Sequence, residues 1–183
     1  AFDFKGGIGT SSRVLSKDRG GYTVGVLVLS NFGSREDLRI DGVPVGRELK
    51  DFQGEGGGGT GSIITVIATD APLDARQLGR LAKRAVHGIA RTGSYTSHGS
   101  GDVIFAFSTR NRIPHYPQGT ILQGEVLSET AINPLFRAVV EATEEAIINS
   151  MFKARTVVGR DDHVLFEIPI EKVVNIMQKY GRL

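Results

Sequence analysis

The chain has 183 residues, 40% of them hydrophobic and 23% charged, which is the usual make-up of a single globular domain. Its 22 basic and 20 acidic residues nearly cancel to a formal net charge of +2, and Lys and Arg form no run, so the sequence does not favour a nucleic-acid partner. Cysteine is absent, which excludes disulfide scaffolds, thiolate metal sites and a cysteine nucleophile.

Glycine is concentrated in residues 1–61, so we expect this part to be rich in turns. The small-residue segment 4–12 is predicted to be a tight loop. Residues 22–29 are apolar or β-branched at nearly every position, which is typical of a strand covered on both faces. Asn31-Phe32-Gly33 ends this strand with a turn. Segment 38–45 predicts a weaker hairpin, broken at Asp41-Gly42.

Residues 53–61 form a glycine-rich linker, which is expected to be flexible. Within it, 54–59 formally fits the dinucleotide fingerprint G-x-G-x-x-G. That fingerprint must open a helix in order to hold a pyrophosphate, whereas residues 62–69 are rich in Val, Ile and Thr and predict a strong strand. We therefore expect no dinucleotide cofactor.

Two long helices are predicted after this strand. Asp74 is a good N-cap for the first helix, Gln77 completes a capping box, and Gly93 is its stop. The second helix begins at Asn133-Pro134, with asparagine at the cap and proline at the first helical position. A strand is predicted between them over 102–109.

A last short helix is predicted over 169–180. The two long helices each carry an apolar stripe, formed by Leu78, Leu81, Ala82, Ala85 and Ile89 and by Leu135, Val139, Ala142, Ala146 and Ile147. Strands thus come first, then strand–helix–strand, then helices. This order predicts a layered α/β or α+β domain in which helices cover a sheet.

The Gly61–Ser62 bond joins the linker to the predicted strand. A serine hydroxyl can attack the carbonyl of the preceding residue, and water can then hydrolyse the resulting ester. Glycine leaves that carbonyl unhindered and lets the backbone bend. The product would carry an α-amine beside the Ser62 hydroxyl, and this amine, with an unperturbed pKa of about 8, could act as a base. Most Gly-Ser pairs are nevertheless ordinary flexible loops, so spacing alone does not decide between these interpretations.

A cluster of hydroxyl groups lies in 94–102, between a helix and a strand, where α/β folds present functional loops. Ser100 is sterically open between two glycines, and Asp102 could orient and polarise its hydroxyl. His98 invites a serine–histidine interpretation, but a lone loop histidine more often faces solvent. No metal-ligand spacing is present among His87, His98, His115 and His163, so no metal site is expected.

Motifs along most of the chain resemble those of one family. They are FKGGIGTSSR at 4–13, VLVLSNFG at 26–33, SIITVIATDAPL at 62–73, RTGS at 91–94, GSGD at 99–102, FAFST at 105–109, NPLF at 133–136 and VEATEEA at 140–146. The run 62–73 is similar to the start of the small subunit in the L-aminopeptidase/D-esterase (D-aminopeptidase) family. These are self-cleaving N-terminal-serine hydrolases, and the family includes the β-peptidyl aminopeptidases.

The resemblance implies that the precursor cuts itself between Gly61 and Ser62 and that Ser62 is the nucleophile. Ser100 and Asp102 would match the family's Ser-Gly-acid element, which assists proton transfer around the nucleophile. Asn31 would match the asparagine that helps to hold the oxyanion. The implied fold is an αββα four-layer sandwich of the self-processing hydrolase type, and neither a metal nor an organic cofactor is expected.

The resemblance also implies how the chain is organised. Residues 1–61 would be the C-terminal part of the large subunit, ending in the linker 53–61, and residues 62–183 the small subunit. The two would form one structural domain. Family precursors extend well upstream of this chain's first residue, and that region contributes sheet strands and part of the substrate pocket.

The expected activity is hydrolysis of N-terminal residues from small peptides, amides or esters through an acyl-enzyme on Ser62. The expected partners are these substrates, the complementary subunit fragment and further copies of the protein in a homo-oligomer. Two alternatives stay open. One is an acyltransferase like the ornithine acetyltransferases, which use threonine at the cleavage point. The other is a non-catalytic assembly protein that retains the fold.

The longest apolar runs are too short to cross a bilayer, so no membrane partner is expected. No secretory signal is visible at the start of the chain. Together with the absence of cysteine, this makes the cytoplasm the expected location.

Overall fold

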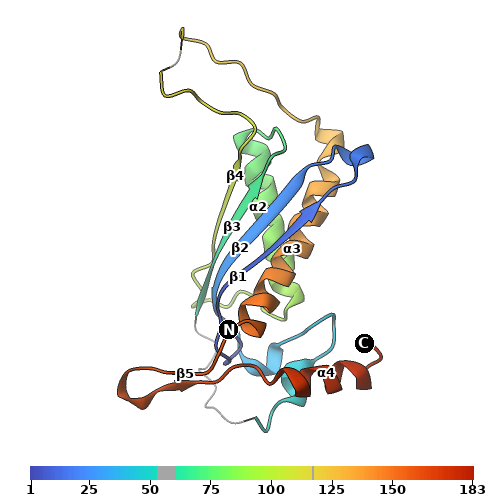
Figure 1. Ribbon diagram of the computed structural model, residues 1–183, viewed down its shortest axis with the longest axis vertical. Coiled ribbons are helices and arrows are strands. Elements are labelled where there is room, and N and C mark those ends of the chain that lie inside the picture. Colours follow the sequence, from blue (N-terminus) through green and yellow to red (C-terminus); the bar gives the residue numbers. More distant parts are fainter. Residues whose placement is uncertain (53–60, 117) are drawn as a thin grey trace.

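The computed structural model describes residues 1–52, 61–116 and 118–183. A four-stranded sheet runs through its centre in the order β1-β2-β3-β4 (Figure 1). Its strands are β1 Gly7–Val14, β2 Thr23–Asn31, β3 Ser62–Thr69 and β4 Val103–Ser108. Both β1 and β3 run antiparallel to β2, whereas β4 runs parallel to β3.

The helices α2 Ala75–Arg91 and α3 Asn133–Phe152 pack against each other on one face of this sheet (Figure 1). Parallel strands need a crossover connection, and α2 supplies it between β3 and β4. The shorter α1 Val45–Glu48 and α4 Ile170–Lys179 lie at the end of the sheet where β3 begins. Smaller elements are the hairpin of β5 Val157–Val158 with β6 Val164–Leu165 and the 3-10 turns η1 Lys17–Arg19, η2 Arg35–Asp37, η3 Glu129–Ala131 and η4 Arg160–Asp162.

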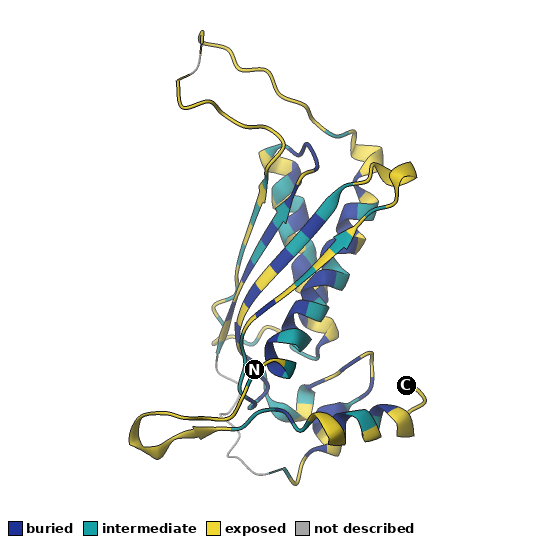
Figure 2. Cartoon of the chain, in the orientation of Figure 1, coloured by how far each residue is buried: buried dark blue, intermediate teal, exposed yellow. Residues whose placement is uncertain are grey.

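Burial alternates along β2 and β3, so the sheet has one covered and one open face (Figure 2). The covered face packs against α2 and α3 and buries side chains such as Val26, Val28, Ile63 and Ile67. The open face carries exposed apolar side chains, at Ile8, Leu27, Leu29, Ile64, Val103, Phe105 and Phe107. The prediction that β2 is covered on both faces is therefore not met within the described residues, because the helices pack on one side only.

The strongest sequence signals are confirmed. Strand β3 begins at Ser62, as predicted. At the start of α2 the Asp74 carboxylate accepts a hydrogen bond from the Gln77 N–H at 2.6 Å, and the Gln77 side chain accepts one from the Asp74 N–H at 3.2 Å. This is the expected capping box. Gly93 follows the end of α2 with φ +105°, which explains why the helix stops there.

The prediction of a loop over 4–12 is wrong, because residues from Gly7 onward form strand β1. The small residues allow close packing of this strand on α3 rather than a loop. A Cβ at Gly9 would lie 2.0 Å from the carbonyl oxygen of Ala146. The Ser11 hydroxyl donates a hydrogen bond of 2.7 Å to the Glu145 carboxylate, which ties the same strand to the same helix.

Two smaller expectations also need correction. Asn133 is the first residue of α3 rather than its cap, and Ile132 occupies the cap position without a side-chain hydrogen bond. The predicted hairpin over 38–45 is reduced to a single bridge between Ile40 and Val43, since α1 begins two residues later. The turn itself is where it was expected, with positive φ at Asp41 and Gly42.

The connection between β4 and α3 extends away from the body as a long arm (Figure 1). At its base the Arg110 guanidinium pairs with the Glu125 carboxylate at 2.8 Å, and the Asn111 side chain makes two hydrogen bonds to the Glu125 backbone. Close by, Arg76 donates a hydrogen bond to Glu129 that lowers the pKa of this carboxyl group to about 2. Within the described ranges, no helix combines the length and hydropathy needed to cross a membrane.

We predict that Gly9→Ala lowers the free energy of unfolding by about 1–3 kcal/mol, because the added methyl group pushes β1 away from α3. Gly79→Ala is the matched control. It lies on the exposed side of α2 with nothing within 4 Å of the added Cβ, so it should leave stability unchanged or raise it by up to about 1 kcal/mol. Urea unfolding of both variants measures the difference, and equal stabilities would contradict the close contact.

Candidate active site

Three chain segments meet at one end of the sheet because of the strand directions. Asn31, the last residue of β2, pairs directly with Ser62, the first residue of β3. On the other side of β3, Ile64 pairs with Val103, so the residues just before β4 reach the same sheet end as Ser62. The loop residue Gly101 is thereby brought beside Ser62, 39 positions away in the sequence.

The Ser62 side chain lies on the open face of the sheet. Its neighbour Ile63 is buried against the helices, and strand alternation then directs Ser62 to the opposite side. The Ser62 Oγ accepts a hydrogen bond from the Gly101 N–H at 3.1 Å. This bond gives the hydroxyl a defined position while leaving it exposed to a reacting carbonyl.

Ser100 and Asp102 form a hydrogen-bonded pair next to that contact. The Ser100 Oγ donates to the Asp102 Oδ1 at 2.6 Å, a length typical of a hydroxyl bonded to a charged carboxylate. Both residues are half-buried and flank Gly101 in the sequence. The pair therefore places a polarised hydroxyl and a carboxylate on the two residues that flank Gly101, whose N–H contacts Ser62.

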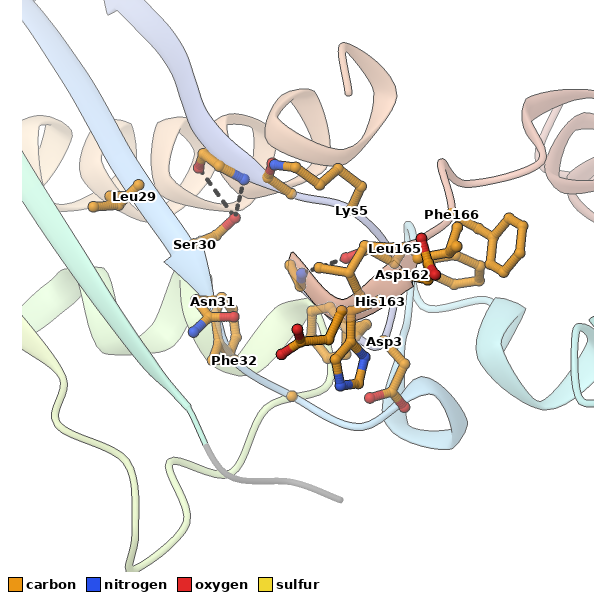
Figure 3. Close-up of a pocket in the computed structure, with 18 residues that line it drawn as sticks. Asp3, Lys5, Leu29, Ser30, Asn31, Phe32, Asp162, His163, Leu165 and Phe166 are labelled. Carbon is orange, nitrogen blue, oxygen red and sulfur yellow. Dashed lines mark hydrogen bonds between the residues drawn. The ribbon is translucent and has the colours of Figure 1, made fainter. Parts of the chain in front are cut away.

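Asn31 stands opposite Ser62, and paired residues of an antiparallel ladder project their side chains to the same face. Figure 3 shows Asn31 at the end of β2, on the rim of a cavity of about 850 Å³. The charged side chains of Asp3, Lys5 and Asp162 also line this cavity. An amide group at this place can donate a hydrogen bond toward a carbonyl that approaches Ser62 over the open face.

Gly61 packs tightly against the end of β2. A Cβ at this position would lie 2.1 Å from the Asn31 carbonyl oxygen and 2.9 Å from the Phe32 Cα. A small cavity next to Gly61 is walled by the loop after α2 and by the segment after β2, with Ser97 and Ser100 among its lining residues. Only a residue without a side chain fits this place, which accounts for glycine directly before Ser62.

The structure thus gathers Asn31, Gly61, Ser62, Ser100 and Asp102 at one sheet end. The rest of the predicted linker, 53–60, lies outside the described residues. The sequence did not single out the Gly101 N–H. The run Gly99-Ser100-Gly101 before a strand indicates an open loop, but the sequence does not show which of its backbone groups contacts Ser62. The register between β3 and β4 shows that it is the Gly101 N–H.

His163 lines the same cavity as Asn31 (Figure 3), whereas the loop histidine His98 is not among the residues that line it. His98 is exposed, as expected for a lone loop histidine. In the part of the chain that the structure describes, no three His, Asp or Glu side chains come together as a metal site would require.

The chain is similar to several known proteins. The chain is 43% identical, over its whole length, to a beta-peptidyl aminopeptidase, BapA, of Sphingosinicella microcystinivorans, and it covers 50% of that relative. A solved protein of Pyrococcus horikoshii OT3 matches all of the chain with a TM-score of 0.93 at 56% identity, and the chain again covers 50% of it. The L-aminopeptidase D-Ala-esterase/amidase of Ochrobactrum anthropi, described as a variant of the Ntn-hydrolase fold, matches with a TM-score of 0.89 at 38% identity.

The chain therefore shares the mixed α/β fold of these neighbours and spans about half of their length. The model of Peptidase family S58 matches residues 1–165. The family that the sequence motifs indicated is confirmed: the chain belongs to peptidase family S58.

Proposed function

We propose that the full-length protein is a self-cleaving N-terminal-serine aminopeptidase, cut between Gly61 and Ser62 and working through an acyl-enzyme on Ser62. The observation that carries this proposal is the Ser62 hydroxyl, held at 3.1 Å by the Gly101 N–H beside the Ser100–Asp102 pair. Acyl transfer needs a nucleophile, a proton acceptor and a donor to the developing oxyanion, and candidates for all three lie at this sheet end. The names of the S58 relatives agree with the reaction class.

Self-cleavage would proceed by acyl shift. The Ser62 Oγ attacks the Gly61 carbonyl carbon and loses its proton, the Gly61–Ser62 C–N bond breaks, and the departing nitrogen takes up a proton to become an α-amine. Water then hydrolyses the Gly61 ester, which gives a carboxylate on Gly61 and restores the Ser62 hydroxyl. The attacked carbonyl belongs to the residue directly before Ser62, so the covalent chain itself keeps it near the hydroxyl.

Turnover would repeat the same chemistry on a substrate. The Ser62 Oγ attacks the substrate's carbonyl, the leaving amine takes a proton, and water releases the acyl group. Two groups are proposed to accept the proton from Ser62: its own new α-amine, and the Ser100 hydroxyl, which is hydrogen-bonded to the Asp102 carboxylate. The Asn31 side-chain amide is proposed as the oxyanion donor, and no step uses a metal or an organic cofactor.

The open face of the sheet supports the αββα sandwich as the complete fold. An exposed row of large apolar side chains crosses all four strands, and such patches mark a missing partner layer. Since the chain spans half the length of its relatives, we propose that the rest of the same polypeptide forms that layer. Residues 1–61 would then end the large subunit and 62–183 would form the small one.

We propose small peptides, amides and esters as substrates. Ser62 and Asn31 lie on the open face, so the second layer would form the remaining walls of the substrate pocket. Assembly into a homo-oligomer and a cytoplasmic location stay predictions from the sequence; native mass spectrometry of the full-length protein tests the first.

Serine at position 62 disfavours the acyltransferase alternative, whose enzymes use threonine there. A transferase would need an acceptor amine for turnover, whereas a hydrolase releases product in water alone. The non-catalytic alternative predicts that a serine-directed inhibitor leaves Ser62 unlabelled. The defined hydrogen bond to the Ser62 hydroxyl supports a catalytic role over the non-catalytic alternative.

We predict that Ser62→Ala abolishes both self-cleavage and peptidase activity of the full-length protein, because it removes the attacking oxygen. Intact mass spectrometry of denatured protein should show a fragment beginning at Ser62 for the wild type and a single uncut chain for the variant. Robust peptidase activity in Ser62→Ala would contradict the proposed function.

We predict that Gly101→Ala slows both reactions by about 10-fold or more, since its Cβ would lie 3.2 Å from the Ser62 Oγ and displace it. Gly99→Ala is the control, two residues earlier in the same loop, where nothing lies within 4 Å of the added Cβ. Its rates should match the wild type. Steady-state kinetics on a small peptide amide compares the three proteins, and equal slowing by both variants would show a general effect on the loop instead.

A further inference from the structure

The loop between α2 and β4 contains a backbone conformation that its residue type disfavours. Thr96 has φ +50°, in the left-handed region, where β-branched residues are genuine outliers. The Thr96 side chain is exposed, so packing into a core does not impose this conformation. Strained backbone of this kind persists where the surroundings hold it, and it clusters at functional sites.

The turn at Thr96 is held by local hydrogen bonds. The Thr96 N–H donates to the Ser94 Oγ at 3.2 Å, and the Thr96 hydroxyl donates to the Tyr95 carbonyl at 2.8 Å. A second turn follows directly, in which the Ser100 N–H donates to the Ser97 carbonyl at 2.8 Å. The direction of the chain that enters this second turn is therefore set at Thr96.

Both ends of the loop are fixed independently of this turn. At the start, a Cβ at Gly93 would lie 1.8 Å from the Asp37 carbonyl oxygen, and the Arg39 N–H donates to the Thr92 carbonyl at 2.9 Å. At the other end, β4 pairs with β3 from Val103 onward. The register of β4 brings the end of the loop to Ser62, and the bend at Thr96 constrains the path by which the chain reaches Ser100 and Gly101.

We propose that Thr96 is a positioning residue, whose left-handed backbone keeps the loop on the path that holds the Gly101 N–H at Ser62. This inference rests on the proposed function of Ser62. Acyl transfer depends on placement to within a fraction of an ångström, so a loop that samples other bends would spend less time in the reactive arrangement. Thr96 acts through Ser100 and Gly101 and does not itself contact the reacting atoms.

The test compares Thr96→Gly with Thr96→Asn in the full-length protein. Glycine adopts the same φ without strain but also many others, whereas asparagine tolerates the left-handed region and can form local hydrogen bonds. We expect Thr96→Gly to lower the self-cleavage rate constant and kcat by about 10-fold, with KM changed less than about 2-fold. Thr96→Asn should keep both rates within about 2-fold of the wild type.

The melting temperature of Thr96→Gly distinguishes a positioning role of Thr96 from a purely structural role, in which the variant would be destabilised. Relief of strain and the greater freedom of glycine in the unfolded chain oppose each other, so the Tm of Thr96→Gly should stay within about 3 °C of the wild type. Thr120→Gly, on the exposed arm, is the matched Thr-to-Gly control and should leave both rates unchanged. Cell-free synthesis with samples taken over time gives the self-cleavage rate, and a small peptide amide gives kcat and KM.

Two outcomes would overturn this inference alone: wild-type rates in Thr96→Gly, or equal slowing in Thr96→Asn, which would assign the effect to the lost threonine side chain. In both cases the wild type still cleaves and Ser62→Ala does not, so the proposed function stands. A wild-type protein that neither cleaves nor hydrolyses the amide would overturn the proposed function and this inference with it.

Discussion

The pairing of β3 with β2 on one side and with β4 on the other is the constraint on which the site depends. Antiparallel pairing brings the end of β2 to Ser62, and parallel pairing brings Gly101 there from the other side. Side-chain alternation adds the orientation: burial of Ile63 against the helices turns Ser62 to the open face. A slip of one residue in β3 would bury Ser62 under the helices, so the hydrophobic pattern that fixes the register also presents the proposed nucleophile on the open face.

The stability of the complete fold and the completeness of the proposed active site both depend on the open face of the sheet. Exposed apolar side chains cross all four strands on the face from which Ser62 and Asn31 project. In the proposed sandwich, the layer that buries this apolar row must also pass beside Ser62. One packing event would then remove the apolar side chains from water and build the far wall of the substrate pocket, so the complete site would exist only in the assembled fold.

Most helices and strands could be predicted from the sequence, because the residues that favour each of them are close together in the chain. Strand β3 follows from its β-branched run, and α2 from the Asp74–Gln77 capping box. Strand β1 was missed because small residues favour turns when read locally, whereas Gly9 is small so that α3 can approach it. The candidate site residues Ser62, Ser100 and Asp102 were named from motifs, and the structure brings their segments to one sheet end. The hydrogen bond between Gly101 and Ser62 depends on strand pairing, which no short stretch of sequence encodes.

The loop after α2 shows why residue type alone does not reveal which backbone positions matter. Gly93 and Gly101 sit where an added Cβ would meet the Asp37 carbonyl or the Ser62 hydroxyl, while Gly99, in the same loop, faces open space. Thr96 is the reverse case, a β-branched residue in a conformation that suits glycine. Glycine at that point would keep the backbone hydrogen bond to Ser94 but would lose the one that the Thr96 hydroxyl donates to the Tyr95 carbonyl, and it would let the chain bend in more ways. A site that relies on a backbone N–H gains from such restriction, because a backbone donor is only as well placed as the chain that carries it.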